Sequence, residues 1–564
     1  MEAKRIKLPY GISNFERLVR DNYYYVDKTK YIEKLEQRDE PYIFFLRPRR
    51  FGKSLFVSQL RYYYGLEYKD DFNKLFGSYY IGKHPTSRAN KYYVLHFDFS
   101  GIDTTTPENT FNGFLKNVKA GAKEFIKEYG QISPEEKKDI LSENQPNIIL
   151  KNLFIAYRKC KIYIIIDEYD HFANEILAFN FNEFQSFVSK NGFVRKFYET
   201  IKTATGNGIV EFFFGTGVTP ITLDSLTSGF NIAKNFSTNY ELNEMMGFTE
   251  QEVKKLIQKA CCENNDKILN EIKTLYNGYL FEADGQKLYN SDMVLYYLTE
   301  YRIKEKPPKE LIDTNIASDY GKIKNLFALQ EPFRNSEVLY ELMDLGETSA
   351  ILTTQFSFER DFYRDDFVSL LFYLGLISIN RENLDAMVFS IPNYVIKWLY
   401  RYYFIDFIKS ENNIDINIVD VKNAIRELSQ KNNLIPFLDL INNALKTLSN
   451  QDYKRFTEKH IKALFVGFAS LSKLYYIKSE PEIEGNYPDI MFCYRPPLFP
   501  KYQFVFELKY LNKASEKVLE TKTQEAIKQI KKYLKLEEIK NMKNLKAYII
   551  IFVGNKAKIV KNIS

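Results

Sequence analysis

The sequence predicts a multidomain α/β protein whose buried strands end in charged residues. Its 564 residues are too many for one ordinary domain, and at about 150 residues per domain roughly three or four are expected. Strands alternate with helices over residues 40–220, which predicts a mostly parallel sheet with right-handed crossovers. A strand–loop–strand pattern between residues 488 and 509, followed by a helix and a strand, predicts another α/β domain near the C-terminus.

Composition limits the classes of function. Hydrophobic residues make up 45% of the chain and charged residues 27%, values typical of soluble globular proteins. The net charge of +7 and the isoelectric point near 8.7 permit binding to nucleic acid without requiring it. No run reaches the roughly 18 apolar residues of a membrane span, and the start MEAKRIKLPYG has no apolar signal region. We therefore expect a cytoplasmic protein that does not enter a membrane.

Cysteine and histidine are too scattered for several kinds of site. Only four histidines occur, which leaves little for a histidine-rich metal centre or a Ser-His-Asp arrangement. The cysteines include one adjacent pair and no CxxC, so the sequence supports neither a disulfide framework nor a zinc site. A reducing compartment fits this usage. The cysteines are Cys160, Cys261, Cys262 and Cys493.

The first constellation is a basic loop that follows the apolar residues 42–46. Gly52, Lys53 and Ser54 open an amphipathic run with helical spacing as far as residue 64. Backbone N–H groups at a helix start attract phosphate, a lysine there reaches the terminal phosphates, and a serine hydroxyl ligates Mg²⁺. The complete P-loop pattern is not met, because Arg47 replaces its first glycine. The surrounding sequence must therefore decide whether this loop binds phosphate.

A β-branched strand ending in carboxylates supplies that context. Residues 161–166 are typical of a central parallel strand, and Asp167 and Glu168 stand at its C-terminal end, where open α/β sheets place their chemistry. In this Walker B pattern Asp167 holds Mg²⁺ through its water shell, and Glu168 orients or deprotonates the attacking water. The alternative, a strand that happens to end in two surface acids, is disfavoured by the phosphate loop upstream.

A third strand, over residues 209–219, also ends in small polar residues. One of them, Thr216, stands at a position where a sensor residue could touch the γ-phosphate or the attacking water.

The second constellation lies on a predicted hairpin near the C-terminus. With the loop centred near Leu498, the antiparallel register pairs Phe492 with Phe504 and Ile490 with Phe506.

This register brings charged residues together. Asp489 faces Glu507, and like charges directly opposite each other destabilise a sheet unless a cation lies between them. A divalent metal would supply that cation. The two-residue period of a strand places Lys509 on the same face as Glu507, where its ammonium group can activate a water and offset charge on a phosphorane.

Lysines line the helical run that follows and ends near Leu536. A charged helix face is usually just solvated, but beside a metal site such lysines can bind phosphates. A final strand over residues 547–553 is expected to close the domain. The lysines are Lys513, Lys517, Lys522, Lys528, Lys531 and Lys532.

The first 300 residues contain seven motifs, in the order LPYGISNFERL, YYYVDKT, FFLRPRRFGKS, IIIDEYD, FFFGTGVT, GFTEQEV and LYNGYLF. Together they resemble the AAA-ATPase-like family of bacterial and mobile-element proteins. In that family an arginine in place of the first P-loop glycine is usual. The resemblance covers roughly residues 5–300 and implies a parallel-sheet ATPase core followed by a small helical lid.

This resemblance implies which residues bind the nucleotide. ATP would lie at Lys53 and Ser54, with Mg²⁺ held by Ser54 and Asp167. The arginine finger is left open: Arg49, Arg50 and Arg195 are candidates by position, and a homo-oligomeric ring would supply one in trans. The residues predicted to bind ATP and its Mg²⁺ are Arg49, Arg50, Gly52, Lys53, Ser54, Asp167 and Thr216.

Residues 455–560 resemble the PD-(D/E)XK nuclease domain, of restriction-endonuclease-like fold, that is often fused behind this ATPase family. Pro488-Asp489 and Glu507-Leu508-Lys509 match its core motif without gaps. The resemblance implies Mg²⁺ or Mn²⁺ at Asp489 and Glu507, with Glu458 matching the acid of the leading helix and Gln529 the trailing glutamine. Where many relatives carry Gly-Arg before the aspartate, this chain has Tyr487-Pro488.

The predicted division has four parts. Residues 1–245 form the ATPase core and residues 246–305 the lid. Residues 306–450 form a mostly helical middle region with a winged-helix outline, and residues 451–564 form the nuclease-like domain. The charged, proline-bearing stretch 304–309 motivates the second boundary.

Three hypotheses for function follow. The first is an ATP-dependent or ATP-regulated nuclease in which Asp489, Glu507, Lys509 and Gln529 cleave nucleic acid, with DNA the expected partner, and Glu168 serves ATP hydrolysis. The second is an ATP-switched protein that binds nucleic acid or a partner through an inactive nuclease fold. The third is an NTPase alone. Metal titration would separate the first two, because a pure binding module lacks carboxylate-dependent Mn²⁺ binding.

Overall fold

The computed structural model describes most of the chain. Cys262 and the predicted boundary at residue 450 lie outside the described residues. The described residues are 6–171, 192–221, 230–261, 265–313, 327, 332–356, 362–412, 417–447 and 457–563.

The chain packs as two compact units, each built from several segments. The first comprises Met1–Ile303, Ile312–Val338 and Glu347–Tyr394, and the second comprises Lys304–Leu311, Leu339–Gly346 and Val395–Ser564. Two short segments that lie between parts of the first unit along the sequence therefore pack with the second unit. The four-part division stays a prediction.

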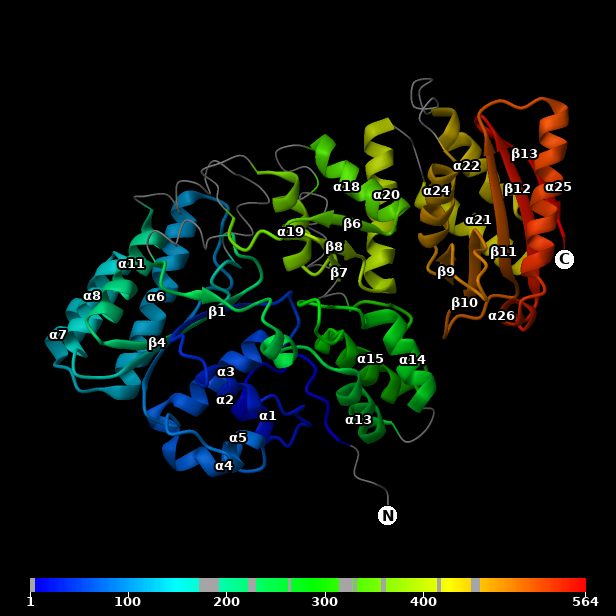
Figure 1. Ribbon diagram of the computed structural model, residues 1–564. Coiled ribbons are helices and arrows are strands. Elements are labelled where there is room, and N and C mark those ends of the chain that lie inside the picture. The colour runs from blue at the N-terminus through cyan, green and yellow to red at the C-terminus, as the bar shows by residue number, and fades with distance from the viewer. Residues whose placement is uncertain are drawn as a thin grey trace, which may run out of the picture. The chain divides into compact units, whose positions relative to one another are not determined.

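A parallel sheet of five strands forms the centre of the first unit (Figure 1). Its order is β2-β3-β4-β1-β5, and every neighbouring pair is parallel, as predicted. Because β4 lies between β1 and β3, the basic loop and the acidic strand end are separated by one strand. The strands are β1 (Tyr42–Leu46), β2 (Tyr93–Asp98), β3 (Ile162–Asp167), β4 (Val210–Gly217) and β5 (Lys234–Asn235).

Helices cover both faces of this sheet. On one side α3 (Lys53–Tyr64) contacts β2, β3 and β4, and on the other α6 (Pro107–Tyr129) and α11 (Phe193–Gly206) pack with α8 (Pro146–Ala156). Figure 1 shows these two groups on opposite sides of the strands. Buried isoleucine and phenylalanine side chains of β1, β3 and β4 fill the space between them. The shorter helices are α1 (Phe15–Arg20), α2 (Lys30–Glu36), α4 (Phe72–Phe76), α5 (Tyr80–Lys83) and α7 (Pro134–Ser142), with 3-10 turns at Leu66–Asp71 and Tyr240–Met245.

The lid region and the middle region follow as helices and one small sheet. Helices α13 (Glu250–Ala260), α14 (Asn265–Tyr276) and α15 (Ser291–Lys304) agree with the predicted helical lid. The predicted helix and hairpin of the middle region are α19 (Arg364–Tyr373) and β7 (Ser378–Asn383) with β8 (Ala386–Ser390); β6 (Glu347–Ala350) adds a third strand. The remaining helices of this stretch are α18 (Pro332–Asp344), α20 (Tyr394–Asn412), α21 (Ile418–Lys431) and α22 (Ile435–Thr447).

A mixed sheet in the order β13-β12-β11-β10-β9 forms the centre of the second unit. The predicted hairpin is correct in register, since Phe492 pairs with Phe504 and Ile490 with Phe506. The strand predicted over residues 547–553 is β12, but its predicted place as the closing strand is wrong: β12 lies inside the sheet, and β13, whose residues alternate in burial, forms the edge. The strands are β9 (Tyr475–Ser479), β10 (Ile490–Tyr494), β11 (Gln503–Leu511), β12 (Leu545–Val553) and β13 (Lys556–Asn562).

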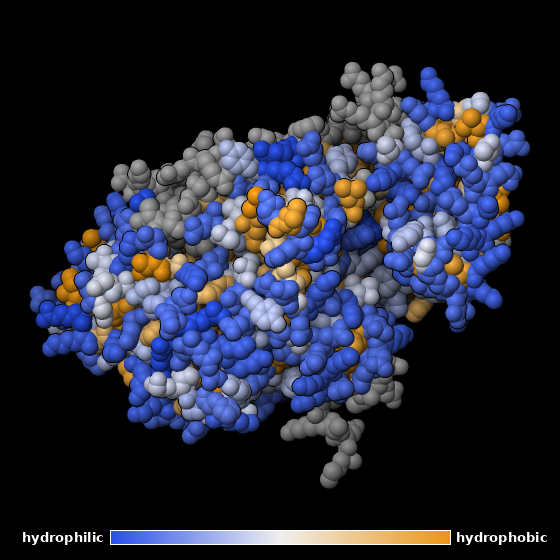
Figure 2. All heavy atoms as spheres, in the orientation of Figure 1, coloured by the Kyte–Doolittle hydropathy of each residue, from blue (hydrophilic) through white to orange (hydrophobic). Residues whose placement is uncertain are grey.

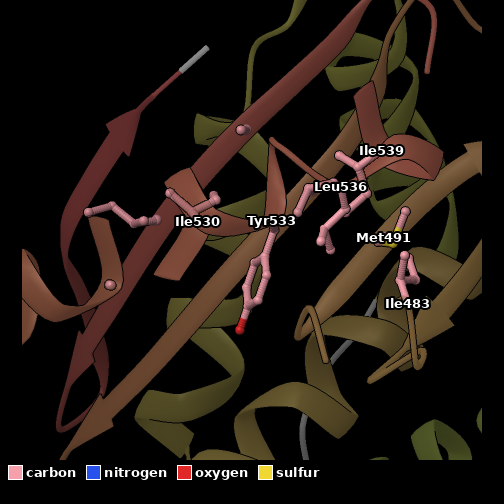
Figure 3. Close-up of a cluster of buried hydrophobic side chains, with 10 residues drawn as sticks. Ile483, Met491, Ile530, Tyr533, Leu536 and Ile539 are labelled. Atoms are coloured by element: carbon pink, nitrogen blue, oxygen red, sulfur yellow. The ribbon is translucent and has the colours of Figure 1, made fainter. Parts of the chain in front are cut away.

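Two layers of apolar side chains hold this sheet between helices. On one face, α25 (Glu516–Tyr533) and α26 (Glu537–Lys540) bury a cluster that includes Ile530, Ile539 and Met491 (Figure 3). On the other face, Phe465 of α24 (Glu458–Ser470) packs against Phe492 and Phe506.

Polar groups cover most of the visible face of the molecule (Figure 2). Within the described residues no helix is both long and apolar enough to cross a membrane.

Candidate functional site

The basic loop between β1 and α3 borders a cavity of about 590 Å³ in the first unit. Gly52 is the residue before the first helical position, and its φ is +91°. Residues with a side chain rarely adopt this backbone conformation. It lets the chain turn sharply into α3, whose first residues line the cavity, and the amide groups of a helix start are the donors that an anion site uses. The predicted residues that line this cavity are Arg49, Arg50, Gly52, Lys53, Ser54 and Glu168.

Lys53 is buried, and its ammonium group donates to the carbonyl oxygens of Arg47 and Pro48, each at 3.1 Å. Burial lowers the pKa of Lys53, although the carboxylates of Glu168 and Asp167 act against it. The lysine is therefore held over its own loop by two neutral acceptors, which a bound phosphate could replace.

The acidic strand end lies within reach of this helix start. Ser54 hydrogen-bonds to Asp167, whose pKa is raised to about 6 mainly by burial. Glu168 has a φ of +50°, and its carboxylate lies 2.9 Å from Nδ1 of His171. Burial favours a higher pKa for Glu168, but the hydrogen bond and charge of His171, together with Lys53, outweigh it and the pKa is lowered. The carboxylate of Glu168 is thus kept ionised, whereas that of Asp167 beside it takes up a proton more easily.

Arg47, the residue in place of the first P-loop glycine, is buried and holds backbone carbonyl groups together. It is 1% exposed, and its guanidinium group donates to the carbonyl oxygens of Leu46, Ser237 and Asn243. The same group lies over the rings of Phe45 and Phe281, 4.3 and 4.1 Å from their centroids. Burial lowers its pKa to about 9. Arg47 therefore connects the start of the loop to segments far along the chain.

The other arginines differ in their surroundings. Arg49 and Arg50 both line the cavity. Arg50 has a φ of +70° and lies 3.7 Å from Asp292 at the start of α15. Arg195 instead pairs with Glu199 on its own helix at 2.9 Å.

Thr216 is not among the residues that line the cavity, and the sensor role predicted for it stays a prediction. It is fully buried inside the sheet, where its hydroxyl group donates to the carbonyl oxygen of Phe45 at 2.7 Å. Because β4 neighbours β1, this hydroxyl joins the two strands. The strand end beyond it is fixed by Asp170, which accepts from the backbone N–H groups of Val218 and Thr219.

The walls of the cavity come largely from segments that sequence reasoning did not assign to the site. Several of these segments belong to the motifs LPYG, YYYVDKT and GFT. Most of their side chains in the wall are apolar or aromatic, and such residue types do not by themselves indicate a ligand-binding site. These wall residues include Pro9, Ile12, Tyr24, Val26, Met246, Phe248, Ser291 and Asp292.

In the second unit, Asp489 stands one residue before β10 and is 6% exposed. Its Oδ2 accepts from the backbone N–H of Leu508 at 2.7 Å, which places the carboxylate beside the strand that carries Glu507. Glu507 is 1% exposed, and its Oε2 is buried without a hydrogen-bond partner. Burial and the nearby Asp489 carboxylate raise the pKa of Glu507 to about 7.

Cations lie against these carboxylates. Lys509 is 2.8 Å from Glu507, as the strand period predicts, and 3.8 Å from Glu458. Lys462, which sequence reasoning missed, lies 2.5 Å from Asp489 Oδ1 and 2.7 Å from Glu480. The docking of α24 on the sheet brings Lys462 to Asp489. Glu480 directly follows β9, and the antiparallel pairing of β9 with β10 brings it beside Asp489.

Gln529 is exposed on α25, four residues before Tyr533 and therefore on the same helix face. Burial raises the pKa of Tyr533 to about 12, and the charges of Glu507 and Asp489 add to this effect. Figure 3 shows the Tyr533 ring in the apolar cluster, with its hydroxyl group pointing away from Ile530 and Leu536. The role predicted for Gln529 stays a prediction.

The acidic pair fits a divalent cation of the Mg²⁺ class. Over the described ranges, no three Asp, Glu, His or Cys side chains form a ready-made cage. Mg²⁺ is usually held by one or two carboxylates, with water and substrate phosphate completing its shell. Asp489 and Glu507 provide that set, and Glu507 Oε2 is an acceptor without a donor. Glu458 contacts both lysines and remains a predicted ligand.

Comparison with known proteins agrees with this architecture. Residues 9–227 match a family model described as predicted AAA-ATPase, and residues 456–562 match the model of the PD-(D/E)XK nuclease superfamily. A protein of Azotobacter chroococcum mcd 1, described as an uncharacterized protein in the vnfD 5′ region, is 25% identical over 304 residues. That alignment covers 52% of this chain and 52% of the relative, so the chain spans about half of the relative's length.

Proposed function

We propose that this chain, which joins an AAA-ATPase-like domain to a PD-(D/E)XK nuclease superfamily domain, is a metal-dependent nuclease regulated by ATP. The observation that carries the proposal is the meeting of Asp489, Glu507 and Lys509 at one end of the β10–β11 hairpin. The expected substrate is nucleic acid, with DNA the first candidate, and the expected compartment is the cytoplasm.

At the nuclease site, each side chain has one task. Asp489 and Glu507 would hold Mg²⁺ or Mn²⁺, which supplies Lewis-acid chemistry at a phosphodiester. Lys509 lies beside Glu507 and can orient a water or offset negative charge on the phosphate. Gln529 and Glu458 are proposed to support this group from α25 and α24.

At the ATP site, the basic loop and the acidic end of β3 are proposed to bind the nucleotide and its Mg²⁺ together. The amides at the start of α3 and Lys53 would bind the phosphates, while Ser54 and Asp167 would hold Mg²⁺. Glu168, kept ionised, is proposed to orient the attacking water. Arg49 and Arg50 line the same cavity and can contact phosphate oxygens.

A panel of single- and double-stranded DNA and RNA, assayed with Mg²⁺ or Mn²⁺ and with or without ATP, tests the nuclease. We expect Lys509→Ala to lower cleavage by at least about a hundredfold, the usual effect of removing one group that stabilises developing charge. Lys556→Ala, at an exposed position of β13, is the matched control and should leave cleavage unchanged. Cleavage that survives Lys509→Ala would reject the assignment.

A matching experiment tests the ATP site. Lys53→Ala and Glu168→Gln should abolish ATP turnover while circular dichroism shows an unchanged fold. Lys69→Ala, at an exposed position of the 3-10 turn Leu66–Asp71, should retain turnover. Undiminished ATP hydrolysis in Lys53→Ala would place the nucleotide elsewhere.

A second candidate function is binding of nucleic acid without cleavage. It is favoured by one observation: both oxygens of Asp489 are already engaged, by Lys462 and by the Leu508 amide. Calorimetric titration with Mn²⁺ separates the two, because a binding module gives no heat that depends on Asp489.

A further inference from the structure

Lys462 is the residue that the proposed nuclease function leaves unexplained. It lies on α24, one turn after Glu458, and is 8% exposed. Its Nζ is 2.5 Å from Asp489 Oδ1, 2.7 Å from Glu480 Oε1 and 3.5 Å from Glu458 Oε1. An ammonium group has three donor directions, and here each is matched by a carboxylate from a different element.

The carboxylates define what this ammonium group does in the absence of metal. Burying an ammonium group costs free energy unless the group is paired. Burial alone would lower the pKa of Lys462, but the carboxylates of Asp489 and Glu480 outweigh burial, and the pKa is raised. Without Lys462, four carboxylates at this site would repel one another, and Lys509 would be their only cation among the ion pairs described here. These carboxylates belong to Asp489, Glu507, Glu458 and Glu480. Lys462 therefore neutralises the acidic group in the metal-free protein.

The same contact obstructs a metal. Leu508 N–H already uses Asp489 Oδ2, and Lys462 uses Oδ1. A divalent cation bound at Asp489 must share or take the oxygen that the ammonium group holds, and must also approach a positive charge at short range. Glu480 and Glu458 offer the ammonium group other acceptors when it leaves Asp489.

We propose that Lys462 is a built-in counter-ion of the nuclease site that competes with the divalent metal for Asp489, so that metal binding requires Lys462 to turn to Glu480 and Glu458. This inference rests on the proposed metal site, and it concerns metal affinity rather than cleavage. It assigns Lys462 and Glu480 as positioning residues that set how readily the site loads.

Calorimetric titration of the full-length protein with Mn²⁺, without nucleotide, is the test. Asp489→Asn, titrated in parallel, gives the background from other Mn²⁺ sites. We expect Lys462→Met to bind Mn²⁺ about ten- to a hundredfold more tightly than the unmodified protein, because one charge-assisted hydrogen bond no longer competes. Its melting temperature without metal should fall and should recover on addition of Mn²⁺.

The controls separate competition from a loss of positioning. Lys478→Met removes a lysine that pairs with Glu538 at 2.8 Å in the same unit, and it should leave Mn²⁺ affinity unchanged. Lys462→Arg keeps the charge and should not tighten binding. If Lys462→Met does not fold, Lys462→Gln keeps a donor to Asp489 without the charge and should also bind Mn²⁺ more tightly.

The outcomes distinguish this inference from the proposed function. Equal or weaker Mn²⁺ binding in folded Lys462→Met and Lys462→Gln overturns the competition while leaving the nuclease intact. Tighter binding without cleavage of any substrate supports the competition and counts against the nuclease. Absence of binding that depends on Asp489 in every variant overturns both.

Discussion

Burial and the neighbouring Asp489 carboxylate raise the pKa of Glu507 to about 7. Below that pH the metal-free site holds a proton that a metal must expel. The shift also affects the fold: its contribution to metal-free stability is present below the ordinary glutamate pKa and is lost as the pH rises through about 7. As the pH rises through about 7, the loss of the Glu507 proton therefore favours metal binding and lowers the stability of the metal-free protein.

We therefore predict that Mn²⁺ affinity is nearly constant above pH 8 and falls as the pH drops below 7, approaching about tenfold per pH unit. Calorimetry in buffers of different ionisation enthalpy should detect close to one proton released at pH 6 and much less at pH 8. Asp489→Asn provides the background. Affinity that does not change between pH 6 and pH 8 would contradict the raised pKa.

A second prediction concerns Arg47, whose guanidinium group ties three carbonyl oxygens together inside the protein. Arg47→Met leaves these acceptors without their donor, and we expect it to lower the free energy of unfolding by about 2–4 kcal/mol. Chemical denaturation measures this. Arg17→Met, which removes an exposed arginine paired with Asp21, should cost less than about 1 kcal/mol. Equal effects of the two changes would refute the anchoring role.

At the scale of elements, the position of Gly52 decides how α3 presents its first amides. A Cβ at Gly52 would meet open space, since the nearest atom is Ser291 Oγ at 4.0 Å, but the φ of +91° disfavours any side chain. The cost of substitution is therefore backbone strain and not a clash. Gly206, the last residue of α11, also faces open space and has no positive φ.

These two glycines form a matched pair for experiment. We expect Gly52→Ala to destabilise the protein by about 1–2 kcal/mol, and to weaken ATP binding because the turn before α3 relaxes. Gly206→Ala should be neutral or stabilise the protein by up to about 1 kcal/mol, since alanine loses less entropy in a helix. Thermal unfolding and nucleotide titration measure both. A neutral Gly52→Ala would show that α3 starts without the left-handed turn.

How far the sequence predicts the elements depends on whether their signal is local. Apolar runs identified β1 and β3, and the centring of a short loop set the register of β10 against β11, because both signals lie within a few residues. The edge strand β13 was not predicted, since its alternating lysines leave no apolar run. The burial of Arg47 and Thr216 was missed because it depends on neighbours about 170–240 residues away.

At the scale of the whole molecule, Lys304–Leu311 has a particular place in the chain. This segment packs with the second unit, although residues on both sides of it belong to the first. Arg495 donates to the carbonyl oxygen of Lys309, and Lys473 pairs with Glu310 at 2.6 Å. The segment directly follows α15, whose first residues, Ser291 and Asp292, line the proposed ATP cavity. A covalent path of one helix therefore leads from that cavity to a segment anchored in the nuclease-like unit.

If ATP regulates cleavage along this path, loosening the anchor should uncouple the two activities. We predict that Arg495→Met retains ATP turnover and metal-dependent cleavage, while the ratio of cleavage rates with and without ATP moves towards 1. Lys473→Met breaks an exposed ion pair worth less than about 1 kcal/mol and the contact of its ammonium group with the Trp398 ring, but it leaves the hydrogen bonds of Arg495 in place and should keep most of the ATP effect. A full ATP effect in folded Arg495→Met would mean that regulation does not pass through this segment. Loss of cleavage in both the presence and the absence of ATP would instead assign Arg495 to the integrity of the nuclease-like unit, where its buried guanidinium group also holds the carbonyl oxygen of Lys473.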